Sequence, residues 1–126
     1  MRFPIVTRYP DYDSKGHANN AVYLTYFENA RHEVWTEVFG GEEDFPFILA
    51  EATVRYVSEA MLGERLDIEI HTSEVRTKAW VWSYVIRARD TDRVVAEGQT
   101  VQVMYDYEAK QTVPIPDDVR QKLATV

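Results

Sequence analysis

Residues 8–31 read RYPDYDSKGHANNAVYLTYFENAR, and the rest of the chain is best interpreted outward from this stretch. It begins in extended residues, passes through a polar turn holding Asp11, Asp13, Gly16 and His17, and then enters a long helical pattern. Gly16 can supply the positive φ that such a turn requires. A carboxylate, a glycine turn and a helix N-terminus therefore lie close together in sequence, a combination suited to chemistry on an electrophilic carbonyl.

The apolar spacing after this turn predicts a helix over residues 20–39. Asn19 or Asn20 is a good N-cap, and Gly40 and Gly41 follow at the position where helices commonly end. One face collects the apolar residues Tyr23, Tyr26, Phe27, Ala30, Val34 and Val38. Because this apolar arc covers roughly half of the circumference, the helix needs a surface that wraps around it.

Most of the remaining chain has the alternating and β-branched composition of strands. The expected strands are residues 2–8, 47–57, 64–73, 78–89 and 93–106, with an acidic loop at 42–44 and a short final helix over 116–124. Gly98 is expected to mark a bulge or bend, and Trp80, Trp82 and Tyr84 share one strand face as core or interface residues. The order predicts one α+β domain over residues 1–126, with a mostly antiparallel sheet curved around the helix.

The composition excludes several classes of function. The chain has 126 residues, 45% of them hydrophobic, which is typical of one globular domain. It has no run of about 18 apolar residues, so no membrane span is expected. The absence of cysteine excludes disulfides and thiol catalysis and is typical of a cytoplasmic protein. A net charge of −7 without a Lys/Arg cluster argues against nucleic-acid binding.

The polar turn leaves alternatives open at the level of single residues. Asp13 is either a turn-capping residue or a catalytic carboxylate, whereas Asp11 is expected to be structural or to support Asp13. His17 could orient Asp13, contact a substrate or hydrogen-bond the turn. The run is not a calcium loop, because Lys15 and Val22 stand where ligands are required, and the scattered histidines do not form a metal site. No metal and no cofactor are therefore expected.

The pattern Y-x-D-x-D-x-x-G-H-x-N-N-x-x-Y-L-x-Y-F-E-x-A-R over residues 9–31 resembles the signature that opens the helix in hotdog-fold acyl-CoA thioesterases of the 4-hydroxybenzoyl-CoA thioesterase type. The order of elements matches that family over nearly the whole chain. The resemblance implies a hotdog fold, in which a five-stranded sheet wraps around one long helix, and hydrolysis of an acyl-CoA to a free acid and CoA. The enzyme that names the family lacks the Gly-His-x-Asn-Asn run, so its acyl specificity does not transfer.

The resemblance also assigns roles to residues. Asp13 matches the family's catalytic carboxylate, as nucleophile or general base, and Asn20 matches the position whose backbone N–H faces the thioester oxygen. His17 is expected to support these two. The expected substrate contacts are Tyr9, Tyr23, Arg76, Thr77 and Lys78, the last three of them near the CoA-binding surface.

The resemblance further implies a homodimer with edge-to-edge sheets and an active site at the interface, often assembled into a homotetramer. Glu28 could supply a second carboxylate from the helix, but a local ion pair with Arg31 is the preferred interpretation. Two other functions remain open at this stage. One is a thioesterase that acts on acyl carrier protein, and the other is a non-catalytic module that binds acyl-CoA.

Overall fold

A computed structural model describes residues 1–41 and 45–126, so the acidic loop expected at residues 42–44 lies outside the described part. A short 3-10 turn, Tyr9–Asp11, precedes the long helix. The helices and strands are β1 (Arg2–Ile5), α1 (Val22–Phe39), β2 (Phe47–Tyr56), β3 (Leu66–Val75), β4 (Ala79–Ala88), β5 (Arg93–Asp106), β6 (Gln111–Thr112) and α2 (Asp117–Leu123).

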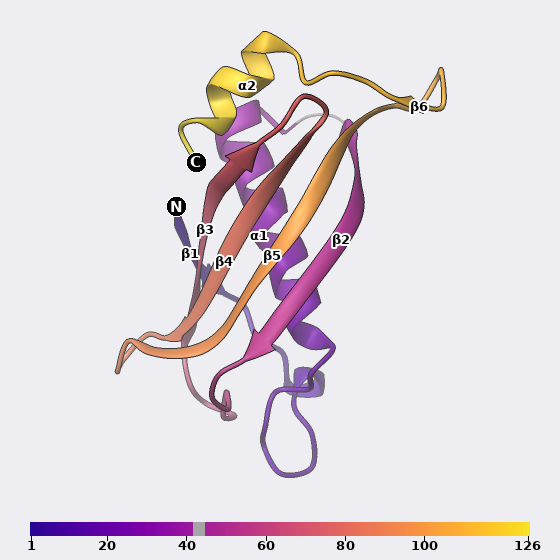
Figure 1. Ribbon diagram of the computed structural model, residues 1–126. Helices are drawn as coiled ribbons and strands as arrows, with labels where there is room; N and C mark the ends of the chain where they lie inside the picture. The colour runs from indigo at the N-terminus through magenta and orange to yellow at the C-terminus, as the bar shows by residue number, and fades with distance from the viewer. Residues whose placement is uncertain (42–44) are drawn as a thin grey trace.

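The strands form one antiparallel sheet in the order β1-β3-β4-β5-β2, and β6 pairs with the end of β5. Figure 1 shows α1 running along one face of this sheet, with α2 beside the C-terminal end of α1. The expected wrapping of a sheet around one helix is therefore observed. The short β6 is an addition to the five predicted strands, since a two-residue strand leaves almost no periodic signal in the sequence.

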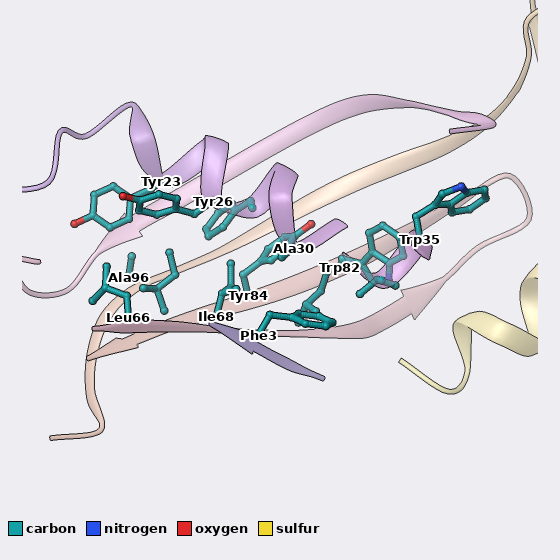
Figure 2. Close-up of a cluster of buried hydrophobic side chains, with 14 of the residues drawn as sticks. Phe3, Tyr23, Tyr26, Ala30, Trp35, Leu66, Ile68, Trp82, Tyr84 and Ala96 are labelled. Carbon is teal, nitrogen blue, oxygen red and sulfur yellow. The ribbon is translucent and has the colours of Figure 1, made fainter. Parts of the chain in front are cut away.

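The core lies between α1 and the sheet, as Figure 2 shows. Phe27 and Val34 of α1 are fully buried, and Phe27 stacks on Tyr84 of β4 with the ring centroids 4.3 Å apart. Trp80, Trp82 and Tyr84 are each at most 1% exposed, which identifies the aromatic strand face as core. Full burial of side chains of this size stabilises the fold by roughly 1.5–3 kcal/mol each.

The two ends of α1 are formed differently. The first helical residue is Val22 and its N-cap is Ala21, which forms no side-chain cap bond. The Asn19 side chain closes the preceding turn by accepting a hydrogen bond from the Ala21 N–H at 3.0 Å. Gly40 ends the helix in the left-handed conformation, with φ 85°. The predicted start at residue 20 is wrong by two residues, and so is the predicted cap at Asn19 or Asn20, because both residues lie in a turn that precedes the N-cap Ala21.

The first strand is shorter than predicted, ending at Ile5 instead of residue 8. Ile5 pairs with Leu66, the first residue of β3, so residues 6–8 have no strand opposite them. A strand needs a neighbour to hydrogen-bond, and extended sequence alone does not supply one. The chain turns at Tyr9–Asp11 instead.

Gly98 has a different role from the predicted bulge. The register is unbroken at this residue, which pairs with Val54 on one side and Tyr84 on the other. A Cβ atom at Gly98 would overlap the Phe27 ring and the Thr53 carbonyl oxygen. Glycine is therefore required because α1 packs directly against the backbone of β5.

We predict that Gly98→Ala destabilises the protein by about 1–3 kcal/mol, because the added methyl group must displace the Phe27 ring or a strand backbone. Denaturant unfolding followed by circular dichroism measures the effect. Gln99→Ala, a change at the exposed neighbouring residue, is the control and should alter stability by less than about 0.5 kcal/mol. Equal stability of Gly98→Ala and the wild type would contradict this account of the helix packing.

Candidate active site

A cavity of about 290 Å³ lies where the polar turn, the start of α1 and the end of β2 meet. The turn contributes Asp13 and His17, and the start of the helix contributes Asn20 and Tyr23. The remaining wall comes from the end of β2 and the connection to β3, through Tyr56, Val57, Ser58, Glu59 and Ala60. The structure thus brings four residues of the predicted site to one cavity.

Backbone hydrogen bonds hold the polar turn in place. The Asp13 N–H donates to the His17 carbonyl at 2.8 Å, which closes the turn around Gly16. The Ala18 N–H donates to the Ala60 carbonyl at 2.9 Å, and the Leu62 N–H donates to the Gly16 carbonyl at 2.8 Å. The turn is therefore fixed both to itself and to the β2–β3 connection, which limits how far the Asp13 side chain can move.

The Asp13 carboxylate caps this turn and remains open to solvent. Its Oδ1 accepts the backbone N–H groups of Lys15 at 2.8 Å and His17 at 3.1 Å. These two bonds, the one from His17 first, lower the pKa of Asp13 below its ordinary value of 3.8, so the group is ionised at neutral pH. Oδ2 accepts no hydrogen bond from residues 1–41 or 45–126. Asp13 therefore caps the turn through one oxygen and leaves the other free.

The turn that leads into α1 lines the same cavity through Asn20. The Asn20 N–H donates to no acceptor within the described part of the chain. The Asn20 carbonyl accepts a hydrogen bond from the Tyr56 hydroxyl at 2.9 Å, which fixes the Asn20–Ala21 peptide against the end of β2. A free N–H just before a helix N-terminus, favoured by the helix dipole, can stabilise an oxygen that gains negative charge.

The histidine in the turn has an acidic partner that sequence reasoning missed. His17 Nε2 lies 3.2 Å from Glu59 Oε2, and both side chains line the cavity. Glu59 is 42 residues further along the chain, and no spacing rule connects the two positions. Tyr56, which fixes Asn20, escaped prediction for the same reason. Only the fold brings the β2–β3 connection to the turn.

Asp11 is structural, one of the two roles expected of it. It is 3% exposed, and its carboxylate accepts bonds from the Tyr26 hydroxyl at 2.9 Å, the Arg8 backbone N–H at 2.9 Å and the Arg8 guanidinium at 3.0 Å. Burial raises the pKa of Asp11, but these three donors together outweigh burial and lower it below 3.8. Asp11 therefore anchors the turn to α1 and does not reach the cavity.

Several expected substrate contacts do not reach this cavity within one chain. Tyr9 is 81% exposed on the 3-10 turn and lies outside the cavity lining. The β3–β4 turn consists of Arg76, Thr77 and Lys78. The polar turn lies at the other end of β3, beside the β2–β3 connection. Ten residues of β3 separate these ends, or roughly 33 Å at 3.3 Å per residue. Figure 1 shows the β3–β4 turn near α2.

The charges expected to take part in binding are partly engaged elsewhere. Arg76 forms a bidentate pair with Glu74, at 3.0 and 2.9 Å. The predicted ion pair between Glu28 and Arg31 is wrong, because the Arg31 guanidinium points into the core and donates to the Tyr84 hydroxyl at 3.4 Å. Helix spacing allowed the pair, but the position of Tyr84 on β4 was not visible in the sequence.

Two further questions concern metals and membranes. The described residues contain no group of three or more His, Cys, Asp or Glu side chains placed to hold a metal ion. Within the same residues, no helix combines the length and the apolar composition needed to cross a membrane.

Residues 8–123 match the thioesterase-like superfamily, and the chain belongs to that family. The match is broader than the 4-hydroxybenzoyl-CoA thioesterase type that the signature resembles. Among curated proteins, the chain is 25% identical to the long-chain acyl-CoA thioesterase FadM of Escherichia coli K12, covering 98% of this chain and 96% of FadM. It is also 25% identical to the acyl-CoA thioester hydrolase YbgC of Escherichia coli O6:H1, over 84% of this chain and 82% of that protein.

Solved structures of similar proteins confirm the hotdog fold. A predicted thioesterase from Bacillus stearothermophilus superimposes with a TM-score of 0.90 at 25% identity, covering 99% of this chain and 94% of that one. A thioesterase from Thermus thermophilus, solved as a complex with coenzyme A and Zn, gives a TM-score of 0.86 at 25% identity, covering 98% and 92%. The predicted α+β hotdog architecture is thereby confirmed.

We predict that Asp11→Ala lowers the free energy of unfolding by about 1–3 kcal/mol at pH 7, because the Tyr26 hydroxyl and the Arg8 N–H lose a buried acceptor. The pKa of Asp11 is lowered in the folded protein, so its contribution is present above pH 3.8 and is lost as the pH falls through the folded value. The two proteins should therefore converge in stability at acid pH. Tyr26→Phe, which removes one donor, should cost less. A constant difference from pH 7 to pH 2 would contradict the linkage.

Proposed function

We propose that this protein is an acyl-CoA thioesterase that hydrolyses an acyl-CoA to a free acid and CoA. One observation carries the proposal: Asp13, whose ionised carboxylate has a free oxygen, and Asn20, whose N–H has no partner among the described residues just before α1, line the same cavity. The names of the similar proteins FadM and YbgC support this reaction class, and so does the CoA-bound hotdog structure from Thermus thermophilus.

The chemistry assigns one task to each group. The thioester carbonyl oxygen accepts the Asn20 N–H, which stabilises the negative charge that develops when the carbonyl carbon is attacked. Asp13 Oδ2 either removes a proton from the attacking water or itself attacks to form a mixed anhydride that water then hydrolyses. In both routes the carbon–sulfur bond breaks and CoA leaves as a thiolate that takes up a proton. His17, held by Glu59, lies beside Asp13 and orients the attacking group.

The proposed functional unit is a homodimer, with a homotetramer as the larger assembly and the cytoplasm as its location. The long distance between the polar turn and the β3–β4 turn supports a dimer. A two-fold axis that reverses the strand direction places the β3–β4 turn of one copy at the same end of the joined sheet as Asp13 of the other. In this arrangement Arg76, Thr77 and Lys78 of a second copy meet the CoA portion of the substrate, while Tyr9 and Tyr23 contact the acyl side.

We predict that Asp13→Asn lowers kcat/KM by about 10²–10⁴-fold without unfolding the protein. The amide oxygen can still accept the Lys15 and His17 N–H groups, so the turn persists while the negative charge is lost. In the pH profile of wild-type kcat/KM, the loss of activity caused by protonation of Asp13 should occur below pH 3.8, since the pKa of Asp13 is lowered. A panel of short, long and aromatic acyl-CoA esters, assayed with a thiol-detecting dye, measures both effects.

Ser14→Ala, at an exposed residue of the same turn, is the control for the Asp13 variant and should retain full activity. Tight binding of acyl-CoA by the wild type without release of thiol would instead identify a non-catalytic binding module. Hydrolysis of acyl carrier protein thioesters without turnover of CoA esters would identify the protein as an acyl carrier protein thioesterase instead. If Asp13→Asn turns over substrate as fast as the wild type, Asp13 has no catalytic role.

We predict that Lys78→Ala raises KM for an acyl-CoA about two- to fivefold and leaves kcat nearly unchanged, because an exposed ion pair with the CoA phosphates contributes modestly. The same acyl group on pantetheine lacks the nucleotide phosphates and should show no change. Lys110→Ala, which removes an equal charge near β6, is the matched control. Equal effects of Lys78→Ala on both substrates would contradict a phosphate contact.

A further inference from the structure

The connection between β2 and β3, residues 57–65, supplies one wall of the candidate cavity, beside the polar turn. Its first four residues, 57–60, line the cavity, and Figure 1 shows the connection at the lower end of the sheet. The segment contains no helix or strand, so it has no regular ladder of backbone hydrogen bonds of its own. Its shape therefore depends on contacts that other elements supply.

One arginine holds this connection at three points. Arg93, the first residue of β5, donates from Nη1 to the Ser58 hydroxyl at 2.6 Å and to the Glu59 carbonyl at 2.8 Å. Its Nη2 donates to Glu64 Oε2 at 2.6 Å. A planar guanidinium has several donors in a fixed arrangement and can serve such separated acceptors at once, whereas a compact ammonium group cannot.

Glu64 extends this contact to the middle of the connection. Its Oε1 accepts the Met61 N–H at 2.8 Å, while its Oε2 accepts the Arg93 guanidinium. Burial raises the pKa of Glu64, but the Met61 N–H and the Arg93 guanidinium outweigh burial and lower the pKa below its ordinary value of 4.5. The Glu64 carboxylate is therefore ionised at neutral pH, and its pair with Arg93 carries both charges.

The residues that Arg93 holds are those that contact the polar turn. His17 and Met61 face each other in an isolated antiparallel bridge, and His17 Nε2 lies 3.2 Å from Glu59 Oε2. The His17 backbone N–H in turn donates to Asp13 Oδ1 at 3.1 Å. A series of direct contacts thus joins Arg93 to the carboxylate proposed for the chemistry.

We infer that Arg93 is a positioning residue for the hydrolysis: its guanidinium fixes the Glu59 peptide, so that the Glu59 carboxylate keeps His17 in place. Arg93 itself lies outside the cavity lining, so it acts through Glu59 and not on the substrate. A displacement of about 1 Å at a reacting group can cost about 100-fold in rate, so a contact outside the cavity can still limit turnover. The effect on turnover rests on the proposed function, whereas the effect on His17 does not.

Substitution of Arg93 by lysine tests the inference with the positive charge retained. Arg93→Lys should lower kcat for an acyl-CoA about tenfold and change KM by less than about twofold, because it displaces reacting groups and leaves the contacts to CoA intact. Arg65→Lys is the matched control, since Arg65 is exposed, pairs with Asp90 and lies outside the cavity lining. The control should keep kcat within about twofold of the wild type. An unchanged kcat in Arg93→Lys would overturn the inference.

A double-mutant cycle distinguishes action through Glu59 from a general loosening of the fold. Glu59→Gln removes the charge that faces His17. In the Glu59→Gln background, Arg93→Lys should lower kcat by less than about twofold, because the contact through which it acts is already lost. An equal loss in both backgrounds would show independent effects and overturn the inference.

The His17 ring reports the same contact without any turnover. The chain has three histidines, and comparison with His17→Ala assigns the nitrogen NMR signals of the His17 ring. In Arg93→Lys these signals should move toward their positions in Glu59→Gln, whereas Arg65→Lys should leave them unchanged. Signals that stay at their wild-type positions in Arg93→Lys would overturn the inference. If the wild type hydrolyses no acyl-CoA, the proposed function fails, and the ring signals still decide whether Arg93 positions His17.

Discussion

The direct contact between α1 and the backbone of β5 is the constraint on which the rest of the structure depends. Phe27 lies over Gly98 and stacks on Tyr84, so the helix sits as close to the sheet as a strand without a side chain permits. This close approach lets the sheet enclose the broad apolar arc of α1. Because this contact fixes where α1 lies along the sheet, it also fixes where the helix begins and where the Asn20 N–H lies relative to the polar turn.

The candidate site follows from where the helix begins. The Asn19 side chain accepts the Ala21 N–H and the Tyr56 hydroxyl donates to the Asn20 carbonyl, so two segments distant in sequence hold the Asn20–Ala21 peptide, which adjoins the peptide that carries the free Asn20 N–H. Asp11 joins the turn to Tyr26, while Asp13, which lines the cavity, uses one oxygen to close the turn and leaves the other without a hydrogen bond from the described residues. Burial therefore separates two neighbouring carboxylates: Asp11 is 3% exposed and structural, whereas Asp13 is open to solvent and is the one proposed for the chemistry.

The predictions that succeeded and those that failed differ in the range of the interactions involved. The end of α1 at Gly40, its buried face and the strand pattern depend on neighbours within a few residues, and these could be read from the sequence. The pair of His17 with Glu59, the inward turn of Arg31 and the role of Gly98 depend on contacts between distant segments. Arg76, Thr77 and Lys78 fall in the same group, since only the length of β3 shows that they lie far from Asp13.

The sequence by itself determined the class of fold and placed Asp13, His17, Asn20 and Tyr23 together, because all four lie within eleven consecutive positions around one turn and one helix start. The tertiary structure alone decided which groups complete the cavity and which surface stays open. Tyr56 and Glu59 reach the turn only after β2 has crossed the length of α1, and β2 becomes an exposed edge only through the strand order β1-β3-β4-β5-β2. Strand order and burial arise from long-range packing, for which local spacing carries no signal.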